Sequence, residues 1–127
     1  MRMPITGILV AAAAVWAAPS AAEISGSFDG MVEPSGCRSS TASPFKGVIA
    51  GGRVKGMAAL GQTFDWEVEA DGSFGGELFL RKHRRGDKKQ IYEARVEGDT
   101  VVVSAEFGVP GYPQTICTGK AKIPLQK

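Results

Sequence analysis

The sequence has few of the residues from which active sites are usually built. It contains one His and two Cys among 127 residues. The single His, His83, lies among six Lys and Arg residues that disfavour its protonated form, and no Ser–His–Asp arrangement can be argued around it. Two Cys and a distant His are a poor ligand set for a metal ion. We therefore expect a protein that is not an enzyme and has no metal or cofactor.

Helical periodicity and long apolar runs are absent after residue 22. The first 22 residues are different: Arg2 precedes an uncharged, mostly apolar run over 5–18, and small residues follow up to Ala22. This is the layout of a secretory signal peptide cleaved after Ala22, and the run is short for the roughly 20 residues of a membrane-spanning helix. We expect an exported protein, periplasmic or extracellular, with a single β domain over 23–127 and no transmembrane segment in it.

The two cysteines, Cys37 and Cys117, both lie in the expected mature chain. An even number of cysteines in an exported protein is typical of disulfide bonding. We expect one disulfide between them, and two free thiols are the alternative.

Alternation of apolar and polar residues with period two recurs along the chain and predicts β-strands. In "FDWEVEA", Phe64, Trp66 and Val68 point to one side, and the acidic residues between them point to the other. The same pattern, bounded by Gly-containing turns, predicts eight strands, over residues 24–32, 45–50, 53–58, 63–70, 74–82, 89–97, 100–107 and 115–123.

The turns predict how neighbouring strands align. A two-residue turn between the sixth and seventh strands sets Val96 opposite Val101, so that apolar residues meet across the pair. A loop ending in Gly72 joins the fourth and fifth strands and sets Trp66 opposite Gly76, where the ring covers the missing side chain. Every successive connection is compatible with antiparallel neighbours.

The predicted fold is all-β: an eight-stranded antiparallel up-and-down meander forming a small closed or partly closed barrel, with a β-sandwich as the alternative. An even strand number lets the first and last strands pair, which removes both edges. A membrane barrel is disfavoured, because the charged faces alternate with a plausible core. The architecture is similar to that of the small secreted barrels that include lipocalins and avidins. No motif of either family is present, so the similarity implies only a possible ligand mouth at one end.

Charge is distributed unevenly along the expected mature chain. Residues 81–90 hold six basic residues and one acidic residue, which gives +5, whereas the remainder holds eight against twelve, which gives −4. A nucleic-acid binder is usually basic over a whole face, and single-strand binders also need aromatic stacking platforms, which this stretch lacks. Nucleic acid is therefore an unfavoured partner.

Strand counting places the basic stretch and the longer loops at one end of the barrel and the tight turns at the other. Binding residues are usually carried by loops on a rigid scaffold. The candidate ligand-binding residues are therefore those of the loop end: Arg38, Arg81, Lys82, His83, Arg84, Arg85, Lys88, Lys89 and Tyr112.

Two interpretations of the basic stretch compete, a binding site and a solvated hairpin tip. Arg84 and Arg85 are expected to face Lys88 and Lys89 across the turn, and such like-charge pairs are locally unfavourable. This favours a binding role, with an anionic glycan, a lipid headgroup or an acidic protein as the partner. The alternatives are an inhibitor or chaperone-like binder of a protein partner and a small-ligand carrier with an internal cavity.

Overall fold

The computed structural model describes residues 23–35, 42–83, 86–109 and 111–127, with the backbone alone described at 80–83, 86 and 87. These residues form an antiparallel sheet with two short 3₁₀ turns, η2 (Ala59–Gly61) and η3 (Pro113–Thr115). The eight predicted strands are all present, most within three residues of their expected bounds: β1 (Gly26–Ser35), β2 (Ser43–Ala50), β3 (Arg53–Met57), β4 (Thr63–Glu67), β5 (Ser73–His83), β6 (Gly86–Glu97), β7 (Thr100–Gly108) and β8 (Cys117–Pro124).

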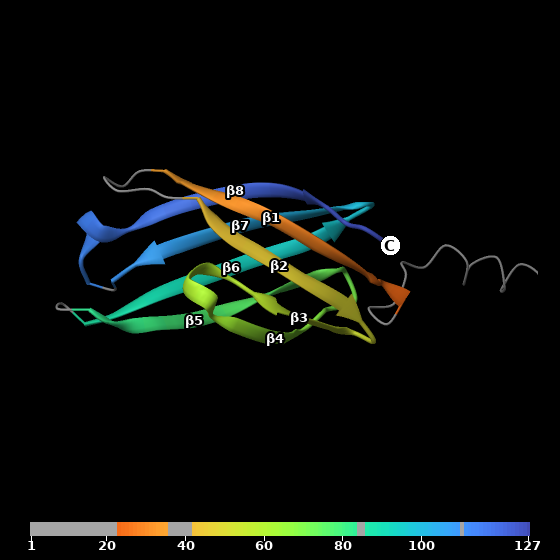
Figure 1. The fold of residues 1–127 in the computed structure, drawn as a ribbon, viewed down its shortest axis with the longest axis horizontal. Coiled ribbons are helices and arrows are strands. Elements are labelled where there is room, and N and C mark those ends of the chain that lie inside the picture. Colours follow the sequence, from red (N-terminus) through yellow and green to blue (C-terminus); the bar gives the residue numbers. More distant parts are fainter. Residues whose placement is uncertain (1–22, 36–41, 84–85, 110) are drawn as a thin grey trace, which may run out of the picture.

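The strands follow the order β4-β3-β2-β1-β8-β7-β6-β5 and curve into a nearly closed barrel. Figure 1 shows β1 and β2 crossing in front of β6 and β7, with β4 and β5 as the two free ends of the sheet. The first and last strands pair as predicted, with Glu33 opposite Lys120 and Ser35 opposite Thr118. The chain therefore closes at β1 and β8 through a true antiparallel ladder.

The register predicted from the turn between the sixth and seventh strands is confirmed, and the short turn between β2 and β3 aligns apolar residues in the same way. Val96 lies opposite Val101 in the β6–β7 pair, and Ile49 lies opposite Val54 in the β2–β3 pair. In each of these pairs a short turn fixes which residues share a face, and the apolar residues then meet inside the barrel. Val54 and Val101 are fully buried.

The prediction that strand closure removes both edges is wrong, because β4 and β5 do not pair. Between them the structure gives backbone hydrogen bonds only at the turn, where the Glu69 N–H donates to the Ser73 C=O at 2.8 Å. Trp66 nevertheless lies over Gly76, as predicted: a Cβ on Gly76 would stand 2.6 Å from the indole Nε1. The ring stands where a ladder would run, so side-chain packing joins β4 and β5 beyond the turn. We call this junction the open seam.

Aromatic rings fill the interior of the barrel. Phe45 lies at the centre of these rings. The centroid of its ring is 5.3 Å from that of Phe28, 5.3 Å from that of Phe64 and 4.9 Å from that of Tyr92. Phe64 in turn stacks on Trp66 at 4.2 Å. Large buried rings contribute more apolar area than any other side chains, so this chain of contacts is the main source of core stability.

The two ends of the barrel differ as predicted. The turns after β2, β4 and β6 are tight, whereas η2, the β5–β6 hairpin and the segment around η3 gather at the opposite end, which we call the loop end (Figure 1). Cys117 opens β8, but Cys37 lies outside the described residues, so the disulfide stays a prediction. Among the residues described, no helix is long and apolar enough to span a membrane.

Candidate binding site at the loop end

The basic stretch continues the β5–β6 ladder past the end of the β6–β7 ladder. Pairing between β6 and β7 ends at Lys89 and Gly108, whereas β5 and β6 remain paired as far as His83 and Gly86. Residues 80–88 therefore extend past the last β7 contact, and we call them the hairpin arm. Both strands run longer than predicted here, since β5 ends at His83 and pairs there with Gly86, where β6 begins.

The expected apposition of like charges is wrong. Lys89 lies opposite Phe79, not opposite an Arg, and Lys82 lies opposite Asp87. A register irregularity between Phe79 and Lys82 shifts the alignment from what a regular two-strand ladder would give. Lys82 thus lies opposite a carboxylate residue across the hairpin and Lys89 opposite an aromatic one, so these two pairs do not bring like charges together.

Lys89 is held at the base of the arm by two neighbours on β5. Its Nζ lies 3.0 Å from Glu77 Oε1 and 5.5 Å from the centroid of the Phe79 ring. The Phe79 ring is 55% exposed, so the cation–π contact stays open to solvent. Lys89 is therefore already paired, and the cations available to a ligand lie further along the arm.

Lys88 occupies a different position, on the row of β6 that faces the interior. Alternation along β6 places it in line with Gln90 and Tyr92, both buried, while Lys88 itself is half-buried. It makes no ion pair with any side chain that the structure describes. An ammonium group without an ion pair among the described side chains thus stands at the loop-end mouth of the barrel.

Below Lys88 lies a small polar group in an otherwise apolar core. The Tyr92 hydroxyl donates to Gln90 Oε1, and the Gln90 Nε2 amide donates to the Ala59 carbonyl of η2 at 3.4 Å. Burial raises the pKa of Tyr92 to about 12, and a backbone hydrogen bond with Ala59 opposes that rise. The phenol therefore stays neutral and serves to satisfy the buried amide and fix η2 over the interior.

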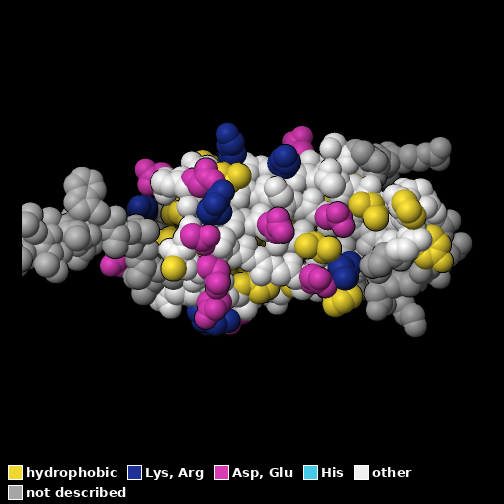
Figure 2. Space-filling model, turned by 180° about the vertical axis from the view of Figure 1, so that it is seen from behind, with side chains coloured by type: hydrophobic (Ala, Val, Ile, Leu, Met, Phe, Trp, Pro, Cys, Tyr) yellow, Lys and Arg dark blue, Asp and Glu magenta, His cyan; other side chains and the backbone are white. Residues whose placement is uncertain are grey.

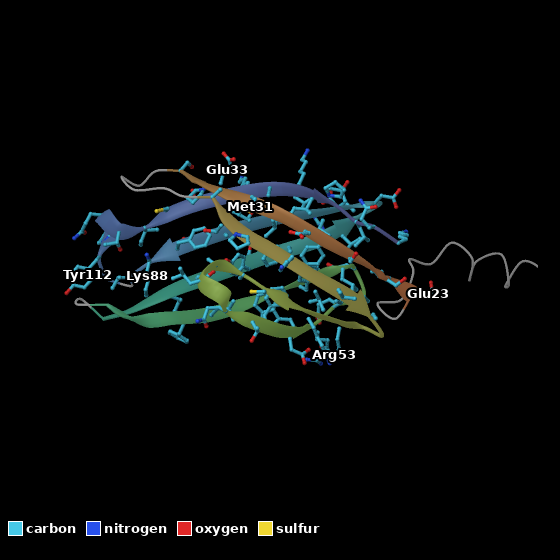
Figure 3. All side chains as sticks on the ribbon, in the orientation of Figure 1. Glu23, Met31, Glu33, Arg53, Lys88 and Tyr112 are labelled. Atoms are coloured by element: carbon cyan, nitrogen blue, oxygen red, sulfur yellow. The ribbon has the colours of Figure 1, made fainter. Side chains whose placement is uncertain are left out.

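Tyr112 is presented by a compact loop between β7 and β8. Its N–H donates to the Val109 carbonyl at 3.0 Å, and Gly111 has φ +87°, which is the conformation of the third residue of a type II turn. Thr115 Oγ1 accepts a hydrogen bond from the Val109 N–H at 3.0 Å and donates to the Tyr112 carbonyl at 2.7 Å. Tyr112 is 36% exposed, and Figure 3 places it at the same end as Lys88.

The remaining candidates are placed only in part. The structure describes the backbone of Arg81, Lys82 and His83, which lies in β5, but not their side chains. Arg38, Arg84 and Arg85 lie outside the described residues. The structure thus brings the arm, Lys88 and Tyr112 to one end of the barrel, as predicted.

Sequence reasoning missed Phe79 and Gln90 at this end. Gln90 could have been found, because the alternation that puts Tyr92 and Ala94 inside puts Gln90 inside as well. Phe79 carried no such signal, since the register irregularity beside it decides what it faces. In the described part of the chain, no three His, Cys, Asp or Glu side chains gather as a metal site would require.

Comparison with known protein families, curated proteins and solved structures yields no match to this chain.

Proposed function

We propose that this protein is an exported, non-enzymatic binding protein that captures an anionic ligand at the loop end. The ligand class is a phosphate- or carboxylate-bearing headgroup or polymer. The hairpin arm and Lys88 supply the charge, and Tyr112 supplies an aromatic contact. The rigid barrel holds all three at one end.

The observation that carries the proposal is the projection of the arm beyond its neighbours. The described residues of the arm, 80–83 and 86–88, have no β7 partner, so this densely basic segment continues past the β6–β7 ladder of an otherwise acidic body. Cations concentrated on a protruding element raise the local concentration of anions and their rate of encounter. Arg residues in the arm also offer the planar donors that suit phosphate and carboxylate.

The lysines of the barrel wall provide a contrast. Lys46 lies opposite Asp29, Lys55 opposite Asp65, and Lys120 opposite Glu33, each in a neighbouring strand. Their charge is interspersed with carboxylates, whereas two cations of the arm, Arg81 and Lys88, have no acidic residue aligned with them in the described ladder. The difference in surroundings, more than the number of cations, distinguishes the arm.

The test is a matched pair of quadruple variants. The first replaces Arg81, Arg84, Arg85 and Lys88 by Ser, and the control replaces Lys46, Lys55, Lys120 and Lys122 by Ser, which removes the same charge from the wall. Vesicles containing phosphatidylglycerol and soluble polyphosphate serve as probes that separate a membrane surface from a free phosphate polymer. We expect the arm variant to lose binding by a hundredfold or more, since each cation near an anionic surface contributes about 1 kcal/mol.

Binding of the wild type is expected to weaken with added salt, and the wall variant is expected to bind much like the wild type. Equal loss in both variants would show that net charge alone is responsible and would overturn the proposal. Absence of wild-type binding to both probes at low salt would overturn it too.

A second candidate is a protein partner recognised by the same end, as an inhibitor or chaperone-like protein would do. The observation favouring it is the exposed Phe79 ring beside Lys89, together with Tyr112. Aromatic and cationic side chains are enriched in the energetic centres of protein interfaces. Capture of one stoichiometric acidic protein by the wild type, and not by the arm variant, would support this candidate over the first.

A small-ligand carrier is less well supported, because stacked rings fill the described interior of the barrel. Export and the Cys37–Cys117 disulfide belong to the proposal as well. Ser35 lies opposite Thr118, so the chain leaves β1 beside Cys117, where a bond to Cys37 needs only a short reach. The intact mass of the exported protein, measured with and without reduction, checks both the cleavage after Ala22 and the disulfide.

A further inference from the structure

The open seam leaves the edge of β5 without a strand partner. The Val96 N–H donates to the Gly72 carbonyl, which precedes β5. The backbone N–H and C=O groups of the even-numbered β6 residues therefore point toward β5. Alternation along an antiparallel ladder then directs the backbone N–H and C=O groups of Gly75, Glu77 and Phe79 away from β6, toward the seam. No β4 residue pairs with these three in the described sheet.

A long, open groove of about 900 Å³ runs beside this edge. One wall comes from β4 and the residues just after it, and the other comes from the outer faces of β5, β6 and β7. Trp66 and Gly76 lie in the groove lining, where the indole covers the glycine. The groove therefore lies beside a strand edge with unpaired backbone groups, which is the requirement for strand addition.

Carboxylates dominate the rim of the groove. Three of them have cationic partners, since Asp65 pairs with Arg53 at 2.8 Å, Glu77 with Lys89 at 3.0 Å and Glu97 with Arg95 at 3.2 Å. The other three carboxylates in the lining have no ion pair within the described part of the chain: Glu67, Glu69 and Glu93.

Among the described residues that line the groove, Arg95 is the single cation, and Arg53 and Lys89 pair with carboxylates from outside the lining, so six carboxylates face three cations and the groove is negative. Figure 2 shows Asp and Glu side chains spread across the back of the molecule, with few Lys or Arg among them.

We propose that the open seam is a second binding site, which takes an extended, Lys- or Arg-bearing segment of a partner protein as an added strand on β5. Backbone groups of Gly75, Glu77 and Phe79 pair with the segment, and its cations on one face lie over the acidic rim. This site is distinct from the loop end, since it uses a sheet edge and the opposite sign of charge. The proposal of this second site does not depend on the proposal of anion binding at the loop end.

The probe is a short synthetic peptide of alternating Lys and Val, which has cations on one face when extended. Amide hydrogen exchange is followed by NMR with and without the peptide. We expect the peptide to slow exchange at Glu77 and Phe79 by about tenfold or more, as new hydrogen bonds form there. A matched peptide with Glu in place of Lys is expected not to bind.

Two comparisons separate strand addition from simple charge attraction. N-methylation of alternate peptide residues keeps every charge and removes the bonding donors, so it is expected to weaken binding about tenfold or more. Glu77→Pro and Glu77→Gln both lose the carboxylate, but only Pro removes the seam-facing N–H, a change that edge strands tolerate. We therefore expect E77P to bind the peptide about tenfold more weakly than E77Q.

Equal binding of the parent and N-methylated peptides would overturn the proposal, because charge alone would then explain the binding. Exchange protection at other sites, with none at the seam, would overturn it as well. Concentration-dependent protection of the seam without peptide would show that a second copy of the chain is the occupant and not a basic partner. If E77P fails to fold, as judged by circular dichroism, the N-methylated peptide still decides the question.

Discussion

The barrel has two seams, and they are held together in different ways. At the seam between β1 and β8, backbone pairing runs from Glu33 and Lys120 to Ser35 and Thr118. At the open seam between β4 and β5, the Trp66 indole covers Gly76 and no ladder forms in the described residues. Backbone hydrogen bonds fix both the distance between two strands and their register, whereas the packing of one ring only keeps the two strands close together.

A glycine marks each seam, and its neighbours show the difference in rigidity. A Cβ on Gly119 would stand 2.7 Å from Val32 Cγ1 and 3.0 Å from the Glu33 carbonyl oxygen, which belongs to the paired backbone. The three atoms nearest to a Cβ on Gly76 would all belong to the Trp66 ring. The comparison teaches that a small barrel can close one seam by the main chain and leave the other to a single side chain.

The largest effect is expected from removing that side chain. Trp66→Ala abolishes the contact across the open seam and the 4.2 Å stack on Phe64. We expect the free energy of unfolding to fall by about 3 kcal/mol, in the range for large aromatic truncations. Urea unfolding followed by circular dichroism measures it, and Trp66→Phe is the control that keeps part of the contact. A loss below about 1 kcal/mol would contradict the role given to this ring.

A smaller effect is expected at Tyr92, which lies opposite Gly76 on the inner side of the same seam. Tyr92→Phe leaves the buried Gln90 carbonyl oxygen without its donor, which is expected to cost about 2 kcal/mol. Folding raises the pKa of Tyr92 from 10.0 to about 12, so the stability that it contributes is present below pH 10 and is lost as pH rises toward 12. The difference in unfolding free energy between wild type and variant should therefore shrink over that interval.

Urea unfolding of both proteins at several pH values checks this expectation. The double variant Tyr92→Phe with Gln90→Leu is the control, since it removes both polar partners and should recover part of the loss. A difference that stays constant between pH 10 and 12 would contradict the buried phenol's contribution.

The smallest effect is a difference between two glycine substitutions. The new methyl group of Gly119→Ala would clash with paired backbone. That of Gly76→Ala would clash with the Trp66 indole, which is half-buried and can move outward. We expect G119A to lose about 1 kcal/mol more stability than G76A, because overpacking costs most where neighbours cannot yield. Thermal and urea unfolding of the two variants give the difference, and equal losses would mean that the open seam is as rigid as the paired one.

The sequence predicts most of this fold because short-range signals decide it. Turn glycines and alternating residues fix local pairs such as Val96 with Val101, and the parity of the strands then assigns each loop to an end. The same reasoning fails at β4 and β5, since whether two sheet edges meet depends on the curvature of all eight strands. Trp66 could be placed on Gly76 from the sequence, but the missing ladder between their strands could not.

The candidate site was predictable in position and less so in detail. Counting strands places Lys88 and Tyr112 at one end, where the structure has them. The pairings inside the arm were not predictable, because the irregularity after Phe79 sets Lys82 opposite Asp87 and His83 opposite Gly86. A single shifted residue changes every charge neighbour that follows it.

The β1–β8 ladder also determines when the barrel can be completed. The Ser27 N–H donates to the Gln126 carbonyl at 2.7 Å, and the Gln126 N–H donates to the Ser27 carbonyl at 2.8 Å, so the start of β1 is tied to residues nearly one hundred positions later. The hairpins between β5 and β8 can form early from near neighbours, but β1 has no partner on that side until β8 arrives. During synthesis, an edge of the β1–β4 sheet therefore waits unpaired, and this interval is when the chain is most exposed to aggregation.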